Sequence, residues 1–439
     1  MRMTVIGTGY LGAVHAACMA ELGHDVLGID SNAAKIEALA TGSAPFFEPG
    51  LPEILGRNLE SGRLRFSTSL AEAADFGNVH FICVGTPQKR GSHAADLRFV
   101  DAVIAGLAPN LTRPCLVVGK STVPVGTAAR LKAVLAELAP AGSEAEMAWN
   151  PEFLREGHAV QDTLSPDRVV VGVTSPHADA VLREIYATAL ESGTPYIATD
   201  LATAELVKVA ANAFLATKIS FINAMADVCE ETGGDVVTLA EAIGHDPRIG
   251  HRFLSAGLGF GGGCLPKDIR AFMARAGELG VGESLTFLRE IDEINMRRRR
   301  RTVEMARTMI GRSFLGQRIT VLGAAFKPDS DDVRDSPALN VAAALQLQGA
   351  QVQVHDPQAI ENARAQFPTL DYTTEVTKAL EGADLVLHLT EWEQYRQLDP
   401  EKVRELVEEP RIFDARNTLD IDQWRNAGWT IRALGRPMR

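Results

Sequence analysis

The sequence predicts an α/β protein with two Rossmann-like, doubly wound domains joined by a central helical region. Short apolar, β-branched runs alternate with helical patterns towards both ends of the chain, which indicates βαβ units and mostly parallel sheets. Between them, apolar residues recur at helical spacing from about Leu201 to Glu231, which predicts one long helix. A chain of 439 residues also exceeds one ordinary core. We therefore expect domains at residues 1–198, 199–310 and 311–439.

The composition is typical of a globular protein, with 46% hydrophobic and 23% charged residues. The formal net charge of −12 argues against nucleic acid or an anionic membrane as a partner. We see no signal peptide, and no stretch approaches the roughly 18 apolar residues of a membrane span. The five cysteines are scattered and odd in number, and no pair has the spacing of zinc ligands. We expect a cytoplasmic protein with reduced thiols and no metal.

The first domain opens with a strand, a glycine turn, a helix and a second strand. The helix is expected from about Tyr10 to Leu22, where Gly23 ends it, and the second strand ends at Asp30. Further strands are expected at residues 79–84, 116–118 and 169–171, with helices at 96–108 and 126–138.

A second α/β pattern begins at Arg318. It predicts strands at residues 318–323, 352–356, 385–388 and 412–414. The first two faintly repeat the opening of the chain, and the second again ends in an aspartate, Asp356. The glycines that follow the first strand of the chain are not repeated here, so this domain is expected to bind a different ligand from the first.

The first motif is Gly-Thr-Gly-Tyr-Leu-Gly at residues 7–12. Its glycines permit a tight turn and a close approach to a pyrophosphate at the positive end of the following helix. The pattern alone is weak, but here it follows a strand, opens a helix and precedes a strand that ends in Asp30. Asp30 can accept both ribose hydroxyls and would repel a 2′-phosphate, which favours NAD over NADP. Lys35 lies near the adenosine end and weakens that preference slightly.

The second motif is Gly-Phe-Gly-Gly-Gly-Cys-Leu-Pro-Lys-Asp at residues 259–268. Glycines are tolerated in such numbers where the backbone must approach a ligand closely. They lead to Cys264 at the expected start of a helix, where the helix dipole favours a thiolate. Asp268 follows one turn later on the same face. A buried cysteine beside a flexible loop is the alternative.

Two further groups carry chemistry less specifically. Lys208 and Asn212 share one face of the long helix, where the lysine is either desolvated for proton transfer or extended to solvent. Residues 150–157 follow a strand and carry Glu152 and Glu156, which are either pocket groups or a negatively charged helix start. A run of five arginines at 297–301 follows acidic residues on a helix and favours a solvated face or a subunit contact.

Taken together, these motifs resemble the UDP-glucose/GDP-mannose dehydrogenase family over nearly the whole chain. The glycine–cysteine block at 259–268 is highly specific and argues against the buried-cysteine alternative. The rest of the resemblance lies at residues 7–12, 84–87, 120–127, 150–157, 208–212, 326–329 and 413–417, and at Arg334.

The resemblance implies an N-terminal NAD domain, a helical centre that builds a homodimer, and a C-terminal domain for the nucleotide sugar. It implies a four-electron oxidation of the sugar 6-hydroxyl to a carboxylate by two NAD, through a thiohemiacetal and a thioester on Cys264. Lys208 and Asp268 would manage the first proton and the oxyanion, and Asn212 would orient the sugar. Glu152 and Thr122 would activate the water that releases the acid. NAD would be held by Gly7, Gly9, Tyr10, Leu11, Gly12, Asp30, Lys35, Thr86, Thr122, Glu156 and Arg334. The sugar nucleotide would be held by Glu152, Phe153, Leu154, Lys208, Asn212, Arg248, Phe260, Gly261, Lys327 and Arg416, with Arg248 reaching in from the neighbouring subunit.

The substrate branch follows from the same likeness. The run from Arg248 through Phe253 to the glycines resembles enzymes that convert UDP-glucose to UDP-glucuronate, and Lys267 argues against the UDP-N-acetylmannosamine branch. GDP-mannose enzymes share the Cys-Leu-Pro-Lys-Asp run and are the alternative. The loop at 88–93 is more basic than the family pattern. A non-catalytic NAD-binding regulatory protein is an alternative of another class, but it should have lost Cys264, Lys208 or Asp268.

Overall fold

The structure is a computed structural model that describes residues 1–311 and 313–437. These residues form two compact units. The first unit contains residues 1–211 and 270–280, and the second contains residues 212–269 and those from 281 onward. Two of the three divisions fall inside helices, α10 (Leu201–Thr232) and α12 (Leu265–Glu278), and the third follows Gly280, just after α12.

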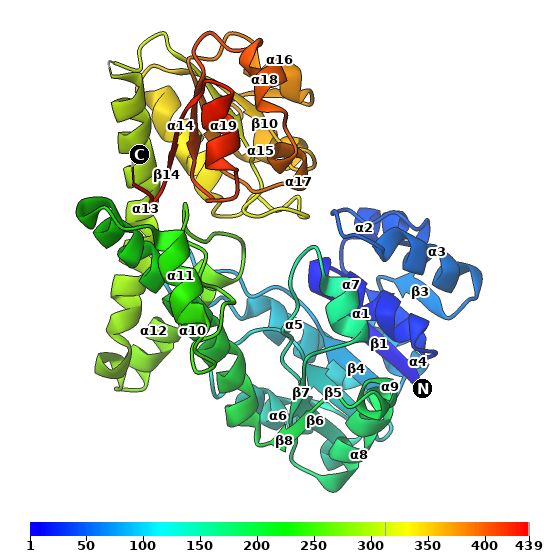
Figure 1. Ribbon diagram of the computed structural model, residues 1–439. Helices are drawn as coiled ribbons and strands as arrows, with labels where there is room; N and C mark the ends of the chain where they lie inside the picture. Colours follow the sequence, from blue (N-terminus) through cyan, green and yellow to red (C-terminus); the bar gives the residue numbers. More distant parts are fainter. Residues whose placement is uncertain (312, 438–439) are drawn as a thin grey trace. The chain divides into compact units, whose positions relative to one another are not determined.

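The first unit is built on an eight-stranded sheet with the order β3-β2-β1-β4-β5-β6-β7-β8 (Figure 1). Neighbouring strands are parallel except β6 and β7, which meet at one antiparallel pair, Trp149 with Gly172. The strand order reverses between β1 and β4, and ligands of such sheets bind at the carboxyl ends of the strands beside that point. The strands are β1 (Arg2–Ile6), β2 (Asp25–Ile29), β3 (Leu64–Ser67), β4 (Val79–Ile82), β5 (Cys115–Gly119), β6 (Ala145–Trp149), β7 (Val169–Gly172) and β8 (Tyr196–Thr199).

Helices cover both faces of this sheet and bury one apolar cluster on each. One cluster includes side chains of α1, α3, α7 and α8, and the other includes side chains of α4, α5 and α6 together with the start of α10. Helices on both faces are what a parallel sheet needs to bury its apolar surfaces. The helices are α1 (Tyr10–Glu21), α2 (Ala33–Ala40), α3 (Leu51–Glu60), α4 (Leu70–Phe76), α5 (Arg98–Leu107), α6 (Thr127–Leu138), α7 (Ala159–Leu164), α8 (Pro176–Ile185) and α9 (Ala187–Glu191).

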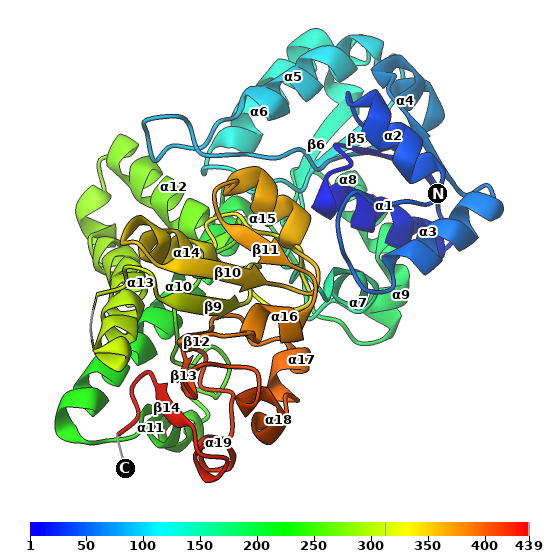
Figure 2. The same ribbon diagram turned by 90° about the horizontal axis from the view of Figure 1, so that it is seen from above.

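The second unit contains a six-stranded parallel sheet with the order β11-β10-β9-β12-β13-β14, which Figure 2 shows with its helices. One large apolar cluster forms its core. The strands are β9 (Arg318–Leu322), β10 (Gln351–His355), β11 (Asp371–Thr373), β12 (Leu385–His388), β13 (Arg411–Asp414) and β14 (Thr430–Ala433). The helices are α11 (Val236–Gly244), α13 (Phe287–Ile310), α14 (Pro337–Leu347), α15 (Ile360–Gln366), α16 (Val376–Leu380), α17 (Glu393–Arg396), α18 (Pro400–Arg404) and α19 (Ile421–Asn426).

The predicted fold class is confirmed, because both sheets are doubly wound and α10 is the expected long helix. By length and composition alone α10 could cross a membrane. Its buried polar side chains argue for a core helix instead. Glu205, Lys208, Asn212, Ser220 and Asn223 are all buried, and a bilayer core offers such groups no water.

Candidate active site

The glycine turn after β1 has the shape that its sequence predicts. Gly7 adopts a positive φ of 94°, and its N–H donates to Ile29 O at 2.7 Å. A Cβ on Gly12 would lie 1.8 Å from Gly7 O, so only glycine fits there. Among the described residues no side chain caps the start of α1, and a Cβ on Gly9 would meet nothing within 4 Å. The start of α1 is therefore uncapped by a side chain and has open space at Gly9, as a pyrophosphate site requires.

Asp30 stands at the end of β2 and organises the same turn. It accepts hydrogen bonds from Thr8 N at 3.1 Å and Asn32 N at 3.0 Å, and it pairs with Lys35 Nζ at 2.7 Å. Burial acts to raise the pKa of Asp30, but the Lys35 and Asn32 hydrogen bonds outweigh it and hold the pKa below its usual value. The carboxylate is thus ionised and near the glycine turn, where a ribose diol would bind. The residues at this turn fit NAD.

The segments after β4 and β5 are joined at the same edge of the sheet. Thr86 Oγ1 donates to Thr122 O at 2.7 Å, and Ser121 Oγ donates to Val84 O at 2.6 Å. Glu205 of α10 accepts from Gly126 N at 2.7 Å and Ala128 N at 2.6 Å, at the start of α6. Burial raises the pKa of Glu205 to about 6. These contacts fix the loop that carries Thr122.

Lys208 is desolvated and does not extend to solvent, so the first of the two alternatives for this side chain holds. Its side chain is 6% exposed, and its Nζ lies 3.0 Å from Glu152 Oε1 and 5.6 Å from the centre of the Phe153 ring. Glu152 also accepts from Leu154 N at 2.6 Å. Residues 150–157 form a loop before α7, so the helix-start alternative for their carboxylates is wrong. The structure brings Lys208, Glu152 and Phe153 together within the first unit.

Cys264 is the exposed cysteine of the five, and all five are thiols. Its carbonyl accepts from Asp268 N at 2.9 Å, which makes it the residue that precedes α12. Burial raises the pKa of Cys18 and Cys83 to about 12 and that of Cys115 to about 11. Cys264 therefore combines access to solvent with a helix N-terminus, the setting in which a cysteine can serve as a nucleophile.

Asp268 lies one turn after Cys264 and is 2% exposed. It accepts from Asn212 Nδ2 at 2.7 Å and from Lys267 Nζ at 2.6 Å. Within the second unit the structure therefore joins Asn212 to Asp268, and the spacing of four residues places Asp268 on the helix face of Cys264.

The glycine segment before Cys264 packs closely on the loop that follows β9. A Cβ on Gly261 would lie 2.4 Å from Asp335 O, and one on Gly263 would lie 2.3 Å from Arg334 Cζ. Gly262 N donates to Arg334 O at 2.8 Å. Larger side chains would push this loop away, so the glycines set the position of Arg334 beside the cysteine.

Four further residues were predicted to hold the sugar nucleotide: Arg248, Phe260, Lys327 and Arg416. Arg416 donates to Leu389 O at 2.7 Å and Gly259 O at 3.2 Å, and thereby ties the glycine segment to the second sheet. Phe260 is buried, the Lys327 Nζ lies 5.8 Å from the Phe326 ring, and the Arg248 side chain is 88% exposed and paired with Asp246.

The interpretation of the arginine run as a solvated face is wrong for two of its members. Arg298 and Arg299 are 1% and 5% exposed. Arg298 donates to Gly257 O at 3.1 Å and pairs with Asp227, and Arg299 pairs with Asp335 at 2.8 Å. Sequence reasoning also missed Asn295, which both accepts from Phe260 N and donates to Phe260 O. These side chains of α13 support the glycine segment.

Outside these groups, three exposed side chains lie close enough to share a cation. Glu241, His245 and His251 each offer one ligand atom within 4.8 Å of the others. His245 Nε2 lies 3.2 Å from Glu241 Oε1. This is a polar contact between two exposed side chains one helical turn apart, and at such exposure it contributes little to stability.

Family models match three consecutive segments of the chain. The NAD binding domain of the UDP-glucose/GDP-mannose dehydrogenase family matches residues 1–190, its central domain residues 202–297, and its UDP binding domain residues 320–421.

Individual relatives match over their whole length. A UDP-glucose 6-dehydrogenase of Rhizobium meliloti is 41% identical over all of both chains, and one of Bacillus subtilis is 39% identical over 99% of this chain and 93% of its own. A UDP-glucose dehydrogenase structure from Pyrobaculum islandicum superposes with a TM-score of 0.89 at 38% identity, covering 98% of this chain and 96% of that one. A GDP-mannose dehydrogenase complex from Pseudomonas aeruginosa gives a TM-score of 0.55 at 26% identity over 99% and 100% of the two chains. The chain therefore belongs to the UDP-glucose/GDP-mannose dehydrogenase family.

Proposed function

We propose that this protein oxidises UDP-glucose to UDP-glucuronate with NAD, and that Cys264 holds the intermediates covalently. The exposed Cys264 at the start of α12, one turn before the Asn212–Asp268 pair, carries the proposal. The relatives named UDP-glucose 6-dehydrogenase and the higher TM-score of the UDP-glucose enzyme favour this substrate over GDP-mannose.

NAD, when bound, would supply the hydride acceptor for two successive oxidations. The glycine turn at residues 7–12 would hold its pyrophosphate at the start of α1, and Asp30 with Lys35 would hold the adenosine ribose. Thr86, Thr122, Glu156 and Arg334 complete the proposed set.

In the first oxidation the sugar 6-hydroxyl loses its proton as its C6 hydrogen leaves as hydride. We assign the handling of that proton and of the developing oxyanion to Lys208 and Asp268. Lys208 is desolvated and paired with a carboxylate, which suits an amine that must exchange a proton. Asn212, held by Asp268, would orient the sugar.

Cys264 would then add to the C6 aldehyde, so that a C–S bond forms and the oxygen takes up a proton. The resulting thiohemiacetal loses its C6 hydrogen as the second hydride and its hydroxyl proton, and becomes a thioester. Water attacks this thioester, the C–S bond breaks, and the acid and the thiol are released. We assign the positioning of that water to Glu152, whose carboxylate lies 3.0 Å from Lys208 Nζ, with help from Thr122.

We also propose a homodimer with a site shared between subunits, in the cytoplasm. Phe214, Phe221 and Val228 recur every seventh residue on α10 and are 67%, 47% and 52% exposed. Such a stripe fits a helix that packs on a second copy. Arg248 is exposed and would exchange its pairing with Asp246 for a partner's substrate, and a reducing compartment would keep all five thiols intact.

The direct test is NADH formation with UDP-glucose, compared with GDP-mannose, at two NADH per sugar. Replacing Cys264 by serine should lower turnover by at least about a hundredfold, because a serine hydroxyl is a far weaker nucleophile and its ester a poorer acyl donor. Cys229→Ala, at a buried cysteine, is the matched control and should keep its turnover. Near-normal turnover of Cys264→Ser would contradict the covalent mechanism.

Subunit sharing has its own test. Arg248→Ala and Cys264→Ala chains should each be inactive as homodimers, and mixing them should restore activity because hybrid dimers contain one intact site. The hybrids are verified by differential tagging. Hybrids that form and stay inactive would contradict a shared site.

A further inference from the structure

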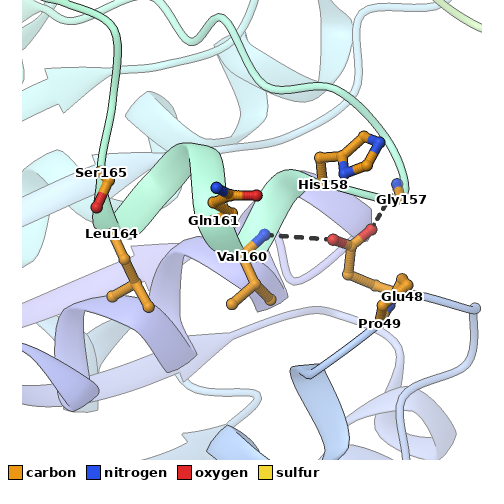
Figure 3. Close-up of a pocket in the computed structure, with 8 residues that line it drawn as sticks. All are labelled: Glu48, Pro49, Gly157, His158, Val160, Gln161, Leu164 and Ser165. Atoms are coloured by element: carbon orange, nitrogen blue, oxygen red, sulfur yellow. Dashed lines mark hydrogen bonds between the residues drawn. The ribbon is translucent and has the colours of Figure 1, made fainter.

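Glu48 is a buried carboxylate in the segment between α2 and α3, and the proposed mechanism gives it no role. Only 3% of the surface of Glu48 is exposed to solvent. It accepts hydrogen bonds from Gly157 N at 2.7 Å and from Val160 N at 3.2 Å, as Figure 3 shows. It also accepts from the hydroxyl of Tyr10, which in turn lies 3.0 Å from Gly157 N.

These contacts join two segments to which NAD binding is assigned. Tyr10 is part of the glycine motif and the first residue of α1. Gly157 follows Glu156 directly and turns the chain with a positive φ of 78°. A single carboxylate therefore links the glycine turn to the loop that carries Glu152 and Glu156.

That loop is held by individual contacts, among them the ion pair of Glu152 with Lys208 at 3.0 Å and the Arg168 guanidinium over the Phe153 ring at 3.8 Å. Residues 151–158 form no helix or strand, so their conformation depends on individual hydrogen bonds. Glu152 accepts from Leu154 N within the loop, and Asp162 holds Arg155 through its backbone N–H and its guanidinium. Glu48 holds the end of the loop that adjoins Glu156.

We propose that Glu48 and Tyr10 are positioning residues that fix Glu156, and through it the Glu152 loop, against the NAD-binding glycine turn. The inference rests on the proposed function for the assignment of Glu156 to NAD. Neither Glu48 nor the Tyr10 hydroxyl needs to touch the cofactor in this role.

The chemistry of the pair suits a permanent link. Burial, together with the neighbouring Glu48, raises the pKa of Tyr10 far above its usual value, so the phenol stays protonated and donates at every working pH. Loss of the carboxylate would leave the N–H group of Val160 without its acceptor and that of Gly157 with only the Tyr10 hydroxyl.

The surroundings of Glu48 favour a local effect over unfolding. A pocket of about 410 Å³ adjoins the carboxylate (Figure 3) and is lined by Glu48, Pro49, Gly157, His158, Val160, Gln161, Leu164 and Ser165. The pocket is open to solvent, so water can enter it and hydrate the Val160 N–H group that loses its acceptor. We therefore expect removal of Glu48 to loosen the loop while the unit stays folded.

The experiment compares Glu48→Ala, Glu48→Gln and Tyr10→Phe with the unmodified protein. NADH affinity is measured by nucleotide fluorescence without sugar substrate, and KM for NAD, KM for UDP-glucose and kcat are measured in turnover. Glu48→Ala should weaken NADH binding and raise KM for NAD by about tenfold, the effect of losing one or two charge-assisted hydrogen bonds. UDP affinity should fall less than NADH affinity, since Glu48 contacts the Gly157 end of the loop, next to Glu156, and not Glu152 or Phe153. Glu48→Gln, which keeps one acceptor oxygen, should rank between Glu48→Ala and Tyr10→Phe.

Two matched controls isolate the link. Glu53→Gln changes an exposed glutamate of the adjacent α3. Tyr196→Phe breaks another tyrosine–carboxylate bond of the first unit, that with Asp179 at 2.9 Å. Both should bind NADH normally.

Unchanged NADH affinity in folded Glu48→Ala would overturn the inference, as would a parallel loss of NADH and UDP binding. If Glu48→Ala does not fold, Glu48→Gln and Tyr10→Phe decide the question by the same measurement. NADH binding needs no sugar, so a failure of the unmodified protein to oxidise UDP-glucose would reject the proposed function separately.

Discussion

The two sheets of this protein share the order of six strands and the turn that follows their first strand. They differ in the hydrogen-bonding groups at that turn that remain available to a ligand. In both, the first strand ends in a glycine with positive φ, Gly7 at 94° and Gly323 at 114°. In both, an aspartate at the end of the second strand accepts from the backbone just after that glycine, Asp30 from Thr8 N and Asp356 from Ala324 N. The shared turn is therefore a property of the fold and does not by itself make a cofactor site.

The aspartates differ in how fully they are used. Asp30 pairs with Lys35 and keeps 11% of its side chain exposed. Asp356 is buried at 2% exposure and accepts from the backbone of Ala324, Ala325, Gln358 and Ala359 and from Trp392 Nε1. Asp30 can still accept hydrogen bonds from ribose hydroxyls. The oxygens of Asp356 are already occupied by hydrogen bonds within its own domain.

The helices that follow differ in the same sense. Tyr10 begins α1 three residues after Gly7, without a side-chain cap among the described residues. After Gly323 the chain runs through residues 324–336 before α14 begins, and the hydroxyl of Ser336 caps that helix at Leu339 N. The first sheet therefore offers uncapped N–H groups to a phosphate, and the second has satisfied them internally.

The largest effect should come from removing the committed aspartate. Asp356→Ala leaves several buried N–H donors without an acceptor, so we expect the free energy of unfolding to fall by about 3 kcal/mol or more. Urea unfolding followed by tryptophan fluorescence measures it, since Trp392, Trp424 and Trp429 lie in this unit. Asp371→Ala, at an exposed position, is the control. A marginal loss for Asp356→Ala would show that the two aspartates do not differ in this way.

The same replacement in the first sheet should change cofactor choice more than stability. Unmodified protein should strongly prefer NAD, because Asp30 would repel a 2′-phosphate. In Asp30→Ala the Lys35 ammonium loses its partner and can meet that phosphate, so the ratio of kcat/KM for NAD over NADP should fall by about tenfold or more. The double variant Asp30→Ala/Lys35→Ala should not show the increase in kcat/KM for NADP that we expect of Asp30→Ala alone. Equal use of both cofactors by the unmodified protein would remove Asp30 from this role.

The contrast also explains what could be predicted from the sequence. The glycine motif, Asp30 and the Cys264 block were predictable because each is a continuous segment whose chemistry is local. Lys208 was left open, since its burial depends on Glu152, which comes from a distant part of the chain.

Glu48 was missed for the same reason, and the buried arginines for a different one. Glu48 acts on Gly157, more than a hundred residues away, and no local pattern announces that contact. For the arginine run a signal existed. The buried face of α13 continues from Leu288 and Ile291 through Asn295 to Arg298 at helical spacing. Following that period, rather than the charge pattern, would have placed Arg298 inside.

The smallest effect is expected at Ser336, which caps α14. The corresponding helix of the first unit, α1, has no such side-chain cap among the described residues. Ser336 Oγ accepts from Leu339 N at 3.3 Å and donates to Ala324 O at 2.6 Å. Loss of such a cap lowers stability by about 1 kcal/mol, so Ser336→Ala should shift the urea midpoint slightly and leave NADH affinity unchanged. Ser69→Ala is the matched variant in the first unit, because Ser69 caps α4 by accepting from Glu72 N at 3.2 Å. It should lose a similar amount of stability, since a cap acts on its own helix in either domain. If Ser336→Ala weakened NADH binding and Ser69→Ala did not, the start of α14 would have a role in cofactor binding, and the contrast between the two sheets would be wrong.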